Sequence, residues 1–490
     1  MTAFWMVFCT PEAFLTLWAI LLLLLVSARE NIHPRSVATW SLMGVVLTLF
    51  LSKYTYQMLH ANPPQLYLVD GLSVFFKDYF LITLFLVLVM GREYICLVES
   101  AKNEFFILPL FTTVGLMLLA SAADFVTMFV ALELVTISLY ILVSYHRDSP
   151  GGLEAGMKYL VVGGMATGFL VYGIAFVFGS TPTGTLNFSM LKVLWTVPEP
   201  SQVVLFAMVL IIAGIGFKIA AVPFHSWAPD VYQGAPTPVT ALLAVASKSA
   251  GFLILIRLFV GGVFATPHLK PVASDIFAWL AAASMILGTL AALTQRNMKR
   301  LLGYSSIANA GFILMGLCDL NQCSVTSVLL YLAVYLIALL LAFYIITHVS
   351  VLLGGEDLRH FTGLSQRSPL LAFGMTIAMA SLAGLPPLAG FAGKLGVFVA
   401  AFSGHTGTYA DHYPLIGVGV VCAAAGLYYY LSVVRAMYWQ DPPETATLEI
   451  SGATCATVLI LVAALVVFGI WQQPLLDKIS FAVSSFHFDI

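Results

Sequence analysis

Charged side chains are scarce in this sequence. Only 9% of the 490 residues are Asp, Glu, Lys or Arg, whereas about a quarter are charged in soluble domains. Hydrophobic residues make up 60% of the chain, and the mean hydropathy is +0.98. This composition predicts a polytopic membrane protein in contact with lipids. The net charge of −2 and the lack of a basic cluster argue against nucleic acid as a partner.

Recognisable cofactor and catalytic motifs are also missing. The sequence has no phosphate-binding loop, dinucleotide fingerprint, nucleophile triad or pair of haem ligands. We therefore expect no cofactor and no metal on this chain, and no redox chemistry on the chain alone. The six cysteines form no CxxC pair and show no His/Cys metal spacing, so disulfides are not expected either. They are Cys9, Cys96, Cys318, Cys323, Cys422 and Cys455.

Apolar runs of about 20 residues, long enough to cross a bilayer as helices, recur from one end of the chain to the other. They predict an all-α polytopic membrane protein with about fourteen transmembrane helices. No shift in composition marks a soluble domain, and the first run is expected to stay as a span rather than be cleaved. The predicted spans are 11–28, 36–58, 71–91, 104–122, 124–145, 154–179, 202–223, 237–262, 274–294, 298–318, 324–353, 369–403, 411–436 and 453–472.

Lysines and arginines are distributed unevenly over the connections between these spans. Of the 21 basic residues, six lie within spans and eleven fall on one side of the membrane. The four on the other side are Lys53, Lys192, Lys270 and Lys478. Because cytoplasmic loops carry the excess of Lys and Arg, both termini are predicted to lie on the outer side.

Two of the predicted helices are interrupted. The seventh breaks at Pro223 in IAAVPFHSW, and the twelfth breaks at Pro386-Pro387 in SLAGLPPLAGFAGK. Each carries a lysine near its break, Lys218 and Lys394, and the two helices lie an odd number of spans apart. Interrupted helices at matching positions of two halves are typical of inverted-repeat transporters with sites near the midplane.

We therefore expect two inverted five-helix repeats, spans 4–8 and 9–13, each with a broken helix. The expected domains are residues 1–103 with the first three spans, 104–262 with the first repeat, 263–436 with the second repeat, and 437–490 with the last span.

Ionisable residues inside the spans are the strongest functional signal. Glu133 lies near the middle of its span, and Lys218, Lys248 and Lys394 lie inside others. A charged side chain at this depth costs roughly 2.5–3.5 kcal/mol on insertion scales, so a functional role is the default interpretation. One deep carboxylate can neutralise at most one of three lysines, and the other two must lose their proton part of the time or lie in water. The sequence thus predicts proton conduction through these four residues.

Structural alternatives remain open for two of them. Glu133 and Lys218 can form an ion pair that only locks two helices together. Lys394 can extend its side chain toward the membrane interface, as long basic side chains do.

Three more residues are candidates for a secondary proton path. Lys158 lies near the start of the sixth span, His225 follows the break at Pro223, and Asp230 is expected near the inner surface. His225 is equally suited to capping a helix end. Trp227 and Tyr232 fit an aromatic belt at the membrane interface.

A family resemblance rests on four stretches of the chain. They are GFKIAAVPFHSWAPDVYQGAPTPVTALLAVASK, NMKRLLGYSSIANAG, SLAGLPPLAGFAGK and EAGMKYLVVGG. With them the whole chain resembles the antiporter-like subunits of respiratory complex I, the bacterial NADH–quinone oxidoreductase (NDH-1), which are related to Mrp-type antiporters. Lys248 stands where sister subunits have histidine, and Lys394 stands where subunit M resembles a Glu-bearing version. The chain also ends after the fourteenth span, without the long lateral helix of subunit L.

The resemblance implies roles for the four buried residues. Glu133 and Lys218 would form the interacting pair of one half-channel, Lys248 the central relay, and Lys394 the terminal group of the other half-channel. It also implies a non-redox, proton-translocating subunit of the enzyme, driven by quinone reduction elsewhere in the complex.

Cofactors and partners are implied in the same way. NADH, FMN, iron–sulfur clusters and quinone would be bound by partner subunits. The expected partners are membrane-arm subunits M, L, K, J, A and H and, through them, the soluble redox arm. The expected location is the bacterial cell inner membrane, with both termini periplasmic. The alternatives are a subunit of an Mrp-type cation/proton antiporter, or the membrane subunit of a related hydrogenase or F420H2 dehydrogenase.

Overall fold

Helices make up the regular structure throughout the described part of the chain. The computed structural model describes residues 10–29, 32–59, 67–95, 103–195, 201–403, 412–442 and 447–485. Within these ranges β-pairing is limited to isolated bridges such as Tyr67 with Ala122. The predicted all-α polytopic class is confirmed. The extreme ends of the chain, Cys9 and Cys96 lie outside the described residues, and the four described cysteines are free.

Eleven helices in these ranges are long and apolar enough to cross a membrane. They are α2 (Pro11–Ala28), α3 (Pro34–Leu59), α4 (Gly71–Ile95), α6 (Phe125–Val143), α7 (Pro150–Gly179), α9 (Gln202–Ile219), the continuous series α11 (Thr237–Leu242), η1 (Leu243–Ser247) and α12 (Lys248–Phe259), α13 (Leu269–Ala292), α15 (Gln322–Leu353), α19 (Tyr413–Trp439) and α20 (Gly452–Ile470). Three shorter apolar helices are α5 (Glu104–Ala120), α17 (Pro369–Ala383) and α18 (Ala389–Ser403). The others are α8 (Phe188–Leu194), α10 (Trp227–Gly234), α14 (Met298–Leu317), η2 (Leu358–Phe361), α16 (Leu364–Arg367) and α21 (Gln473–Ser484).

Helix boundaries follow local capping signals. Asp124 caps α6, because its carboxylate accepts hydrogen bonds from the backbone N–H groups of Val126 and Thr127 at 2.8 and 2.9 Å. Pro150 occupies the first turn of α7, where a missing N–H costs nothing. Gly354 ends α15 with a φ of 69°, a left-handed conformation that suits glycine. Each predicted span contains at least one helix of the structure. The total of fourteen membrane crossings stays a prediction.

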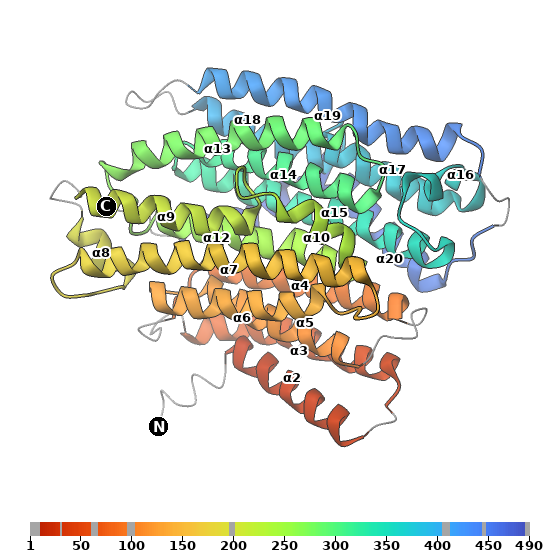
Figure 1. Cartoon of the computed structure of the whole chain (residues 1–490), viewed down its shortest axis with the longest axis horizontal. Coiled ribbons are helices and arrows are strands. Elements are labelled where there is room, and N and C mark those ends of the chain that lie inside the picture. The colour runs from red at the N-terminus through yellow and green to blue at the C-terminus, as the bar shows by residue number, and fades with distance from the viewer. Residues whose placement is uncertain are drawn as a thin grey trace. The chain divides into compact units, whose positions relative to one another are not determined.

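The chain forms two compact units. Unit 1 comprises Met1–Ile219, Gly234–Val272 and Ser480–Ile490, and unit 2 comprises Ala220–Gln233 and Ala273–Ile479. In unit 1, α3 packs on α4, α4 on α5 and α5 on α6, while α7 runs along α9 (Figure 1). In unit 2, α15 packs on α14, α17 and α18 (Figure 1).

Close packing of α7 on α9 depends on glycine. A Cβ at Gly214 would lie 2.8 Å from Leu170 Cβ and 3.0 Å from the Ala166 carbonyl oxygen, and a Cβ at Gly173 would lie 2.7 Å from Ile211 Cγ1. Any larger side chain would push the two helices apart. Because Gly214 lies one turn before Lys218, this contact holds that lysine beside α7.

A buried ion pair fastens one end of α12 in unit 1. The Arg257 guanidinium donates two hydrogen bonds of 2.9 Å to the two carboxylate oxygens of Asp70, just before α4. Its Nε also donates to the Ala120 carbonyl at the end of α5, at 3.1 Å. Arg257 is only 5% exposed. Burial raises the pKa of Asp70, but the guanidinium and the hydrogen bonds outweigh it and hold this pKa below 3.8.

Replacing Arg257 with leucine is expected to destabilise the protein by about 3–5 kcal/mol, because Asp70 is then left buried and unpaired. The double variant Arg257→Leu/Asp70→Leu removes both charges and is expected to be more stable than Arg257→Leu alone. Denaturant midpoints of the purified protein in detergent measure both effects. A double variant as unstable as the sum of the two single variants would contradict this interpretation. Since the folded pKa of Asp70 is lowered, the contribution of the pair is present above pH 3.8 and is lost as the pH falls further.

A second buried ion pair joins α2 to α4. Lys77 Nζ lies 2.9 Å from Glu12 Oε1 and donates to Tyr67 Oη at 2.7 Å, and Tyr67 Oη donates to Glu12 Oε2 at 2.8 Å. Both charged side chains are at most 5% exposed. Glu12 is thus a buried carboxylate in the first turn of its helix, a position from which hydropathy does not predict burial.

Candidate functional site

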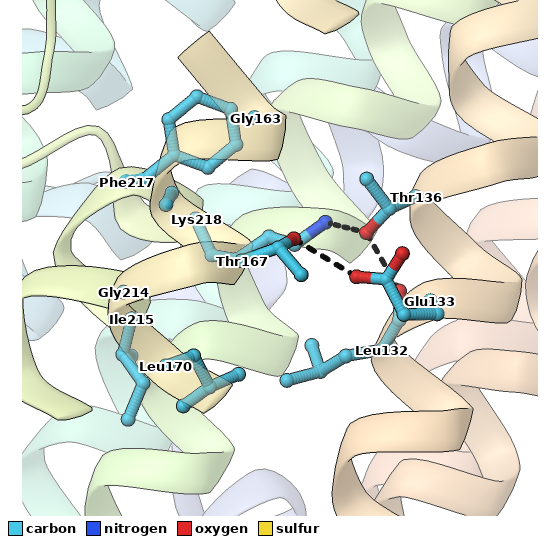
Figure 2. Close-up of a pocket in the computed structure, with 11 residues that line it drawn as sticks. Leu132, Glu133, Thr136, Gly163, Thr167, Leu170, Gly214, Ile215, Phe217 and Lys218 are labelled. Carbon is cyan, nitrogen blue, oxygen red and sulfur yellow. Dashed lines mark hydrogen bonds between the residues drawn. The ribbon is translucent and has the colours of Figure 1, made fainter. Parts of the chain in front are cut away.

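Lys218 and Glu133 face each other across a cavity between α6, α7 and α9, as Figure 2 shows. The Lys218 ammonium donates a hydrogen bond to Thr136 Oγ1 on α6. Thr167 on α7 donates to Glu133 Oε1 at 2.9 Å. Lys218 is 8% exposed, and Glu133 is half-buried.

Hydroxyl groups hold each member of this predicted pair. Among the described residues, no direct ion pair joins Glu133 to Lys218, and each charge is bound instead by a threonine, Thr167 or Thr136. The carboxylate and the ammonium group therefore line one cavity without the fixed geometry of a salt bridge.

The two threonines were missed from the sequence. Thr136 is three residues after Glu133 and hence on the same face of the helix, a spacing that offered a signal. Thr167 offered none, because only the packing of α7 brings it to Glu133.

The break after Lys218 defines the end of α9. Ala220 has a φ of 56°, a left-handed conformation that is unusual for a residue with a Cβ, and the next helix, α10, begins only at Trp227. Lys218 thus lies in the last turn of α9, where unpaired backbone carbonyls make a positive charge favourable. The predicted interruption of this helix at Pro223 is present.

Lys248 is the first residue of α12 and directly follows the π-helical segment η1. Such segments are rare and are found frequently at functional sites. Lys248 is 3% exposed. On the same helix face, a Cβ at Gly251 would lie 2.5 Å from Ile219 Cγ2 and 3.4 Å from Lys218 Cβ. The structure therefore brings the two lysine-bearing helices into contact within one turn of both lysines.

Lys394 lies on α18 of unit 2, at the second helix break. α17 ends at Ala383, and Gly384 continues with a φ of 85°. The Lys394 ammonium donates to the Ala383 carbonyl at 3.1 Å and lies 5.0 Å from the centre of the Phe312 ring. Its side chain is 7% exposed and is directed at the break inside unit 2.

A buried hydrogen-bond network lies in unit 2 on helices that pack on α18. A Cβ at Gly393 would lie 2.6 Å from the Tyr331 ring, so Tyr331 packs against the backbone of α18 at the residue before Lys394. Tyr331 Oη donates to Asn309 Oδ1 at 2.7 Å, and Asn309 Nδ2 donates to Tyr430 Oη at 3.2 Å. Hydroxyl and amide groups from α14, α15 and α19 are thus hydrogen-bonded to one another inside unit 2.

Two of the secondary candidates form ion pairs. Lys158 Nζ lies 2.8 Å from Glu154 Oε1 on α7, and both side chains are exposed. Asp230 Oδ1 accepts from Arg300 at 2.6 Å in unit 2. The structure does not bring Lys158 to the cavity residues, and the roles of both candidates remain predictions.

His225 is half-buried in the turn before α10, and its carbonyl accepts from Ala228 N–H at 3.0 Å, which starts that helix. The neighbouring aromatic residues correct a prediction. Trp227 and Tyr232 are 2% and 0% exposed, so the prediction that they belong to an aromatic belt at the membrane interface is wrong. The reason is that α10 folds into unit 2, where the Tyr232 ring packs on Phe343.

No group of three His, Cys, Asp or Glu side chains suited to a metal occurs among the residues that the structure describes. What they do present is a set of apolar helices, two of them interrupted, with lysines buried at the interruptions. That combination defines a membrane transport protein. The family model described as "NADH:quinone oxidoreductase/Mrp antiporter, TM" matches residues 122–412, and the chain belongs to this family.

The chain is also similar to individual proteins with names and to chains of solved structures. The chain is 39% identical over 463 residues to the NADH-quinone oxidoreductase subunit N of Heliobacterium modesticaldum, covering 94% of this chain and 95% of that protein. A chain of respiratory complex I from Thermus thermophilus with bound aureothin has 32% identity and a TM-score of 0.80, covering 96% of this chain and 99% of that one. A chain of the Mrp complex from Dietzia sp. DQ12-45-1b has a TM-score of 0.84 at 19% identity, covering 98% and 97%, and shows the same fold. The resemblance to the antiporter-like subunits of complex I, predicted from the sequence, is confirmed, and the curated relatives at 35–39% identity are named subunit N.

Proposed function

We propose that this chain is a proton-translocating subunit of an NADH–quinone oxidoreductase, corresponding to subunit N. The observation that carries the proposal is the Glu133–Lys218 site, in which two threonines hold a carboxylate and an ammonium group in one cavity between α6, α7 and α9. The chain itself would perform no redox step. It would move protons across the membrane while quinone is reduced elsewhere in the complex.

The proposed path begins at Glu133. A change in the charge or position of this carboxylate would alter how firmly Lys218 holds its proton. Lys218 would pass the proton to Lys248 on the contacting helix α12, and Lys394 would serve as the terminal group beside the network of Tyr331 and Asn309. Lys158, His225 and Asp230 would support uptake as secondary groups.

The membrane arrangement is part of the proposal. Fourteen crossings, with inverted repeats formed by spans 4–8 and 9–13, would place the two broken helices at equivalent depths in opposite directions. The domains would be residues 1–103, 104–262, 263–436 and 437–490, in a bacterial inner membrane with both termini in the periplasm. The uneven distribution of basic residues supports this orientation.

Co-purification in mild detergent tests the proposal as a whole. We expect the chain to bring with it membrane subunits M, L, K, J, A and H, and the soluble subunits that carry FMN and the iron–sulfur clusters. Recovery with antiporter subunits alone, without iron–sulfur proteins, would instead indicate an Mrp-type cation/proton antiporter. Recovery with a nickel–iron or F420H2-oxidising enzyme would indicate one of the related complexes.

Thr136→Val tests the bridge between the two helices. The substitution keeps the volume but removes the oxygen that accepts from Lys218, a hydrogen bond to a charged group worth about 1.5–3 kcal/mol. NADH-driven proton transport in vesicles is expected to fall about tenfold, since 1.4 kcal/mol corresponds to a factor of 10. Thr136→Ser retains the hydroxyl and should transport nearly normally. Equal transport by the two variants would show that the hydroxyl has no such role.

A further inference from the structure

A buried acid–base pair lies at the end of unit 2 where α14 ends and α19 begins. His412 Nε2 lies 3.8 Å from Asp319 Oδ1 and 3.3 Å from Ser274 Oγ on α13. The His412 and Asp319 side chains are 8% and 5% exposed. Unlike Glu12–Lys77 and Asp70–Arg257, this pair is wider than a hydrogen bond, and the transport path described above does not use it.

Other titratable groups surround the pair. Cys318 precedes Asp319, and its thiol lies within electrostatic reach of both Asp319 and Asp275. Asp275 is exposed at the surface of α13. The groups shown to face His412 itself are the Asp319 carboxylate at the end of α14 and the Ser274 hydroxyl of α13.

Lys394 lies along the same axis of unit 2. Its ammonium is 5.0 Å from the Phe312 ring on α14, and Phe312 precedes Asp319 by two helical turns, about 10 Å at 1.5 Å per residue. On the same two helices, a Cβ at Gly316 would lie 2.7 Å from Val397, one turn beyond Lys394 on α18. The two helices therefore run together from the lysine toward the acid–base pair.

Helix α19 places His412 about as far from the Phe398 and Met315 side chains as α14 places Asp319 from Phe312. A Cβ at Gly419 would lie 3.0 Å from the Phe398 ring and 3.2 Å from Met315 Sδ. His412 lies two turns before Gly419, again about 10 Å away. The rings of Phe312 and Phe398 lie 6.1 Å apart. An apolar layer of Phe312, Met315 and Phe398 thus separates Lys394 from the acid–base pair.

We propose that Asp319 and His412 exchange the proton of Lys394 with the water phase at this end of unit 2. The Lys394 ammonium loses one proton and becomes an amine, the His412 imidazole takes that proton, and bulk water receives it. No electron moves. The distance exceeds a single hydrogen bond, so water must enter between Phe312 and Phe398 during transfer. Ser274 lies within hydrogen-bond distance of the imidazole, and Asp319 provides a negative charge 3.8 Å from it.

This inference rests on the proposed function, and the pH on one side of the membrane tests it separately. The intact complex is reconstituted into liposomes that are loaded with buffers of pH 5.5 to 8.5, and NADH is added outside. The measured quantity is the number of protons delivered to the lumen per NADH oxidised. Because histidine changes charge between about pH 5 and 8, transport by the wild-type protein should fall as the lumen is acidified through this range.

The variants give distinct expected results. His412→Gln should lower the ratio about fivefold at neutral lumen pH and flatten its pH dependence, and Asp319→Asn should move the midpoint of the profile to lower pH. Asp319→Glu keeps the negative charge that Asp319→Asn removes, and it should show the wild-type pH profile. If Asp319 had a purely structural role, this return to the wild-type profile would not be expected. His268→Gln replaces an exposed histidine and should leave the profile unchanged.

Two results separate failure of this inference from failure of the proposed function. A wild-type ratio and profile in His412→Gln, together with lost transport in Lys394→Met, would overturn the role of the pair alone. Normal transport in Lys394→Met would overturn the proposed path itself. NADH–quinone reductase activity measured on the same liposomes shows whether each variant is assembled.

Discussion

Replacing Lys218 with alanine is expected to abolish NADH-driven proton transport through this chain, a loss of at least tenfold. The substitution removes the ammonium group that donates a hydrogen bond from α9 to Thr136 of α6 and that is the proposed proton carrier. Assembly should be preserved, because removing a charge from the membrane interior relieves roughly 2.5–3.5 kcal/mol of insertion cost. Proton uptake by vesicles, normalised to the amount of assembled complex, measures the effect.

Lys53 offers a matched control for this substitution. It is a lysine of α3 in the same unit, but its side chain is exposed. Lys53→Ala should therefore transport protons at the wild-type rate. If Lys218→Ala retained wild-type transport, the assigned role of Lys218 would be rejected. If it lost assembly instead, the lysine would be a structural element of α9.

Helix positions were predictable from the sequence because a bilayer imposes one simple requirement. A chain must satisfy its backbone hydrogen bonds internally over about 30 Å of hydrocarbon, so apolar length alone predicts helices. The breaks at Pro223 and Pro386 were equally visible, since proline and glycine interrupt helices for local reasons. Lys218, Lys248 and Lys394 are buried, but Lys158 in α7 is exposed, so a place in a helix does not by itself predict burial.

Contacts between distant helices were not predictable in this way. Thr167 meets Glu133, and Arg257 meets Asp70, only because of the angles and depths at which their helices pack. Hydropathy assigns a residue to a span but not to a face of the helix that carries it. Trp227 shows the same limit of sequence patterns. An aromatic residue near a helix break is predicted to lie at the membrane interface, and only the fold of α10 shows that this one is buried.

Burial inside the protein differs from depth in the membrane. Glu133 is predicted to be the deep carboxylate, whereas Glu12 is buried against Lys77 in the first turn of α2. Glu12 and Lys77 satisfy each other, whereas Glu133 and Lys218 are held apart by hydroxyl groups. The contrast distinguishes a pair suited to bracing helices from one suited to responding to charge.

Replacing Glu133 with glutamine is expected to lower proton transport at least tenfold while leaving the site intact. The glutamine Oε1 can still accept the hydrogen bond from Thr167, so the packing of α6 on α7 is kept and only the negative charge is lost. Without that charge, the cavity loses the carboxylate that is proposed to control proton release from Lys218. Glu133→Asp keeps the charge on a shorter side chain, and should retain part of the transport.

Glu104 provides the control for the loss of a carboxylate, because it is exposed at the start of α5 in the same unit. Glu104→Gln should transport as the wild-type protein does. The decisive comparison is between Glu133→Gln and Glu133→Ala at equal levels of assembled complex. If charge is what matters, both lose transport alike, although only the alanine variant also loses the Thr167 hydrogen bond. Wild-type transport in Glu133→Gln with loss in Glu133→Ala would show instead that Glu133 acts through that hydrogen bond, as a structural group between α6 and α7.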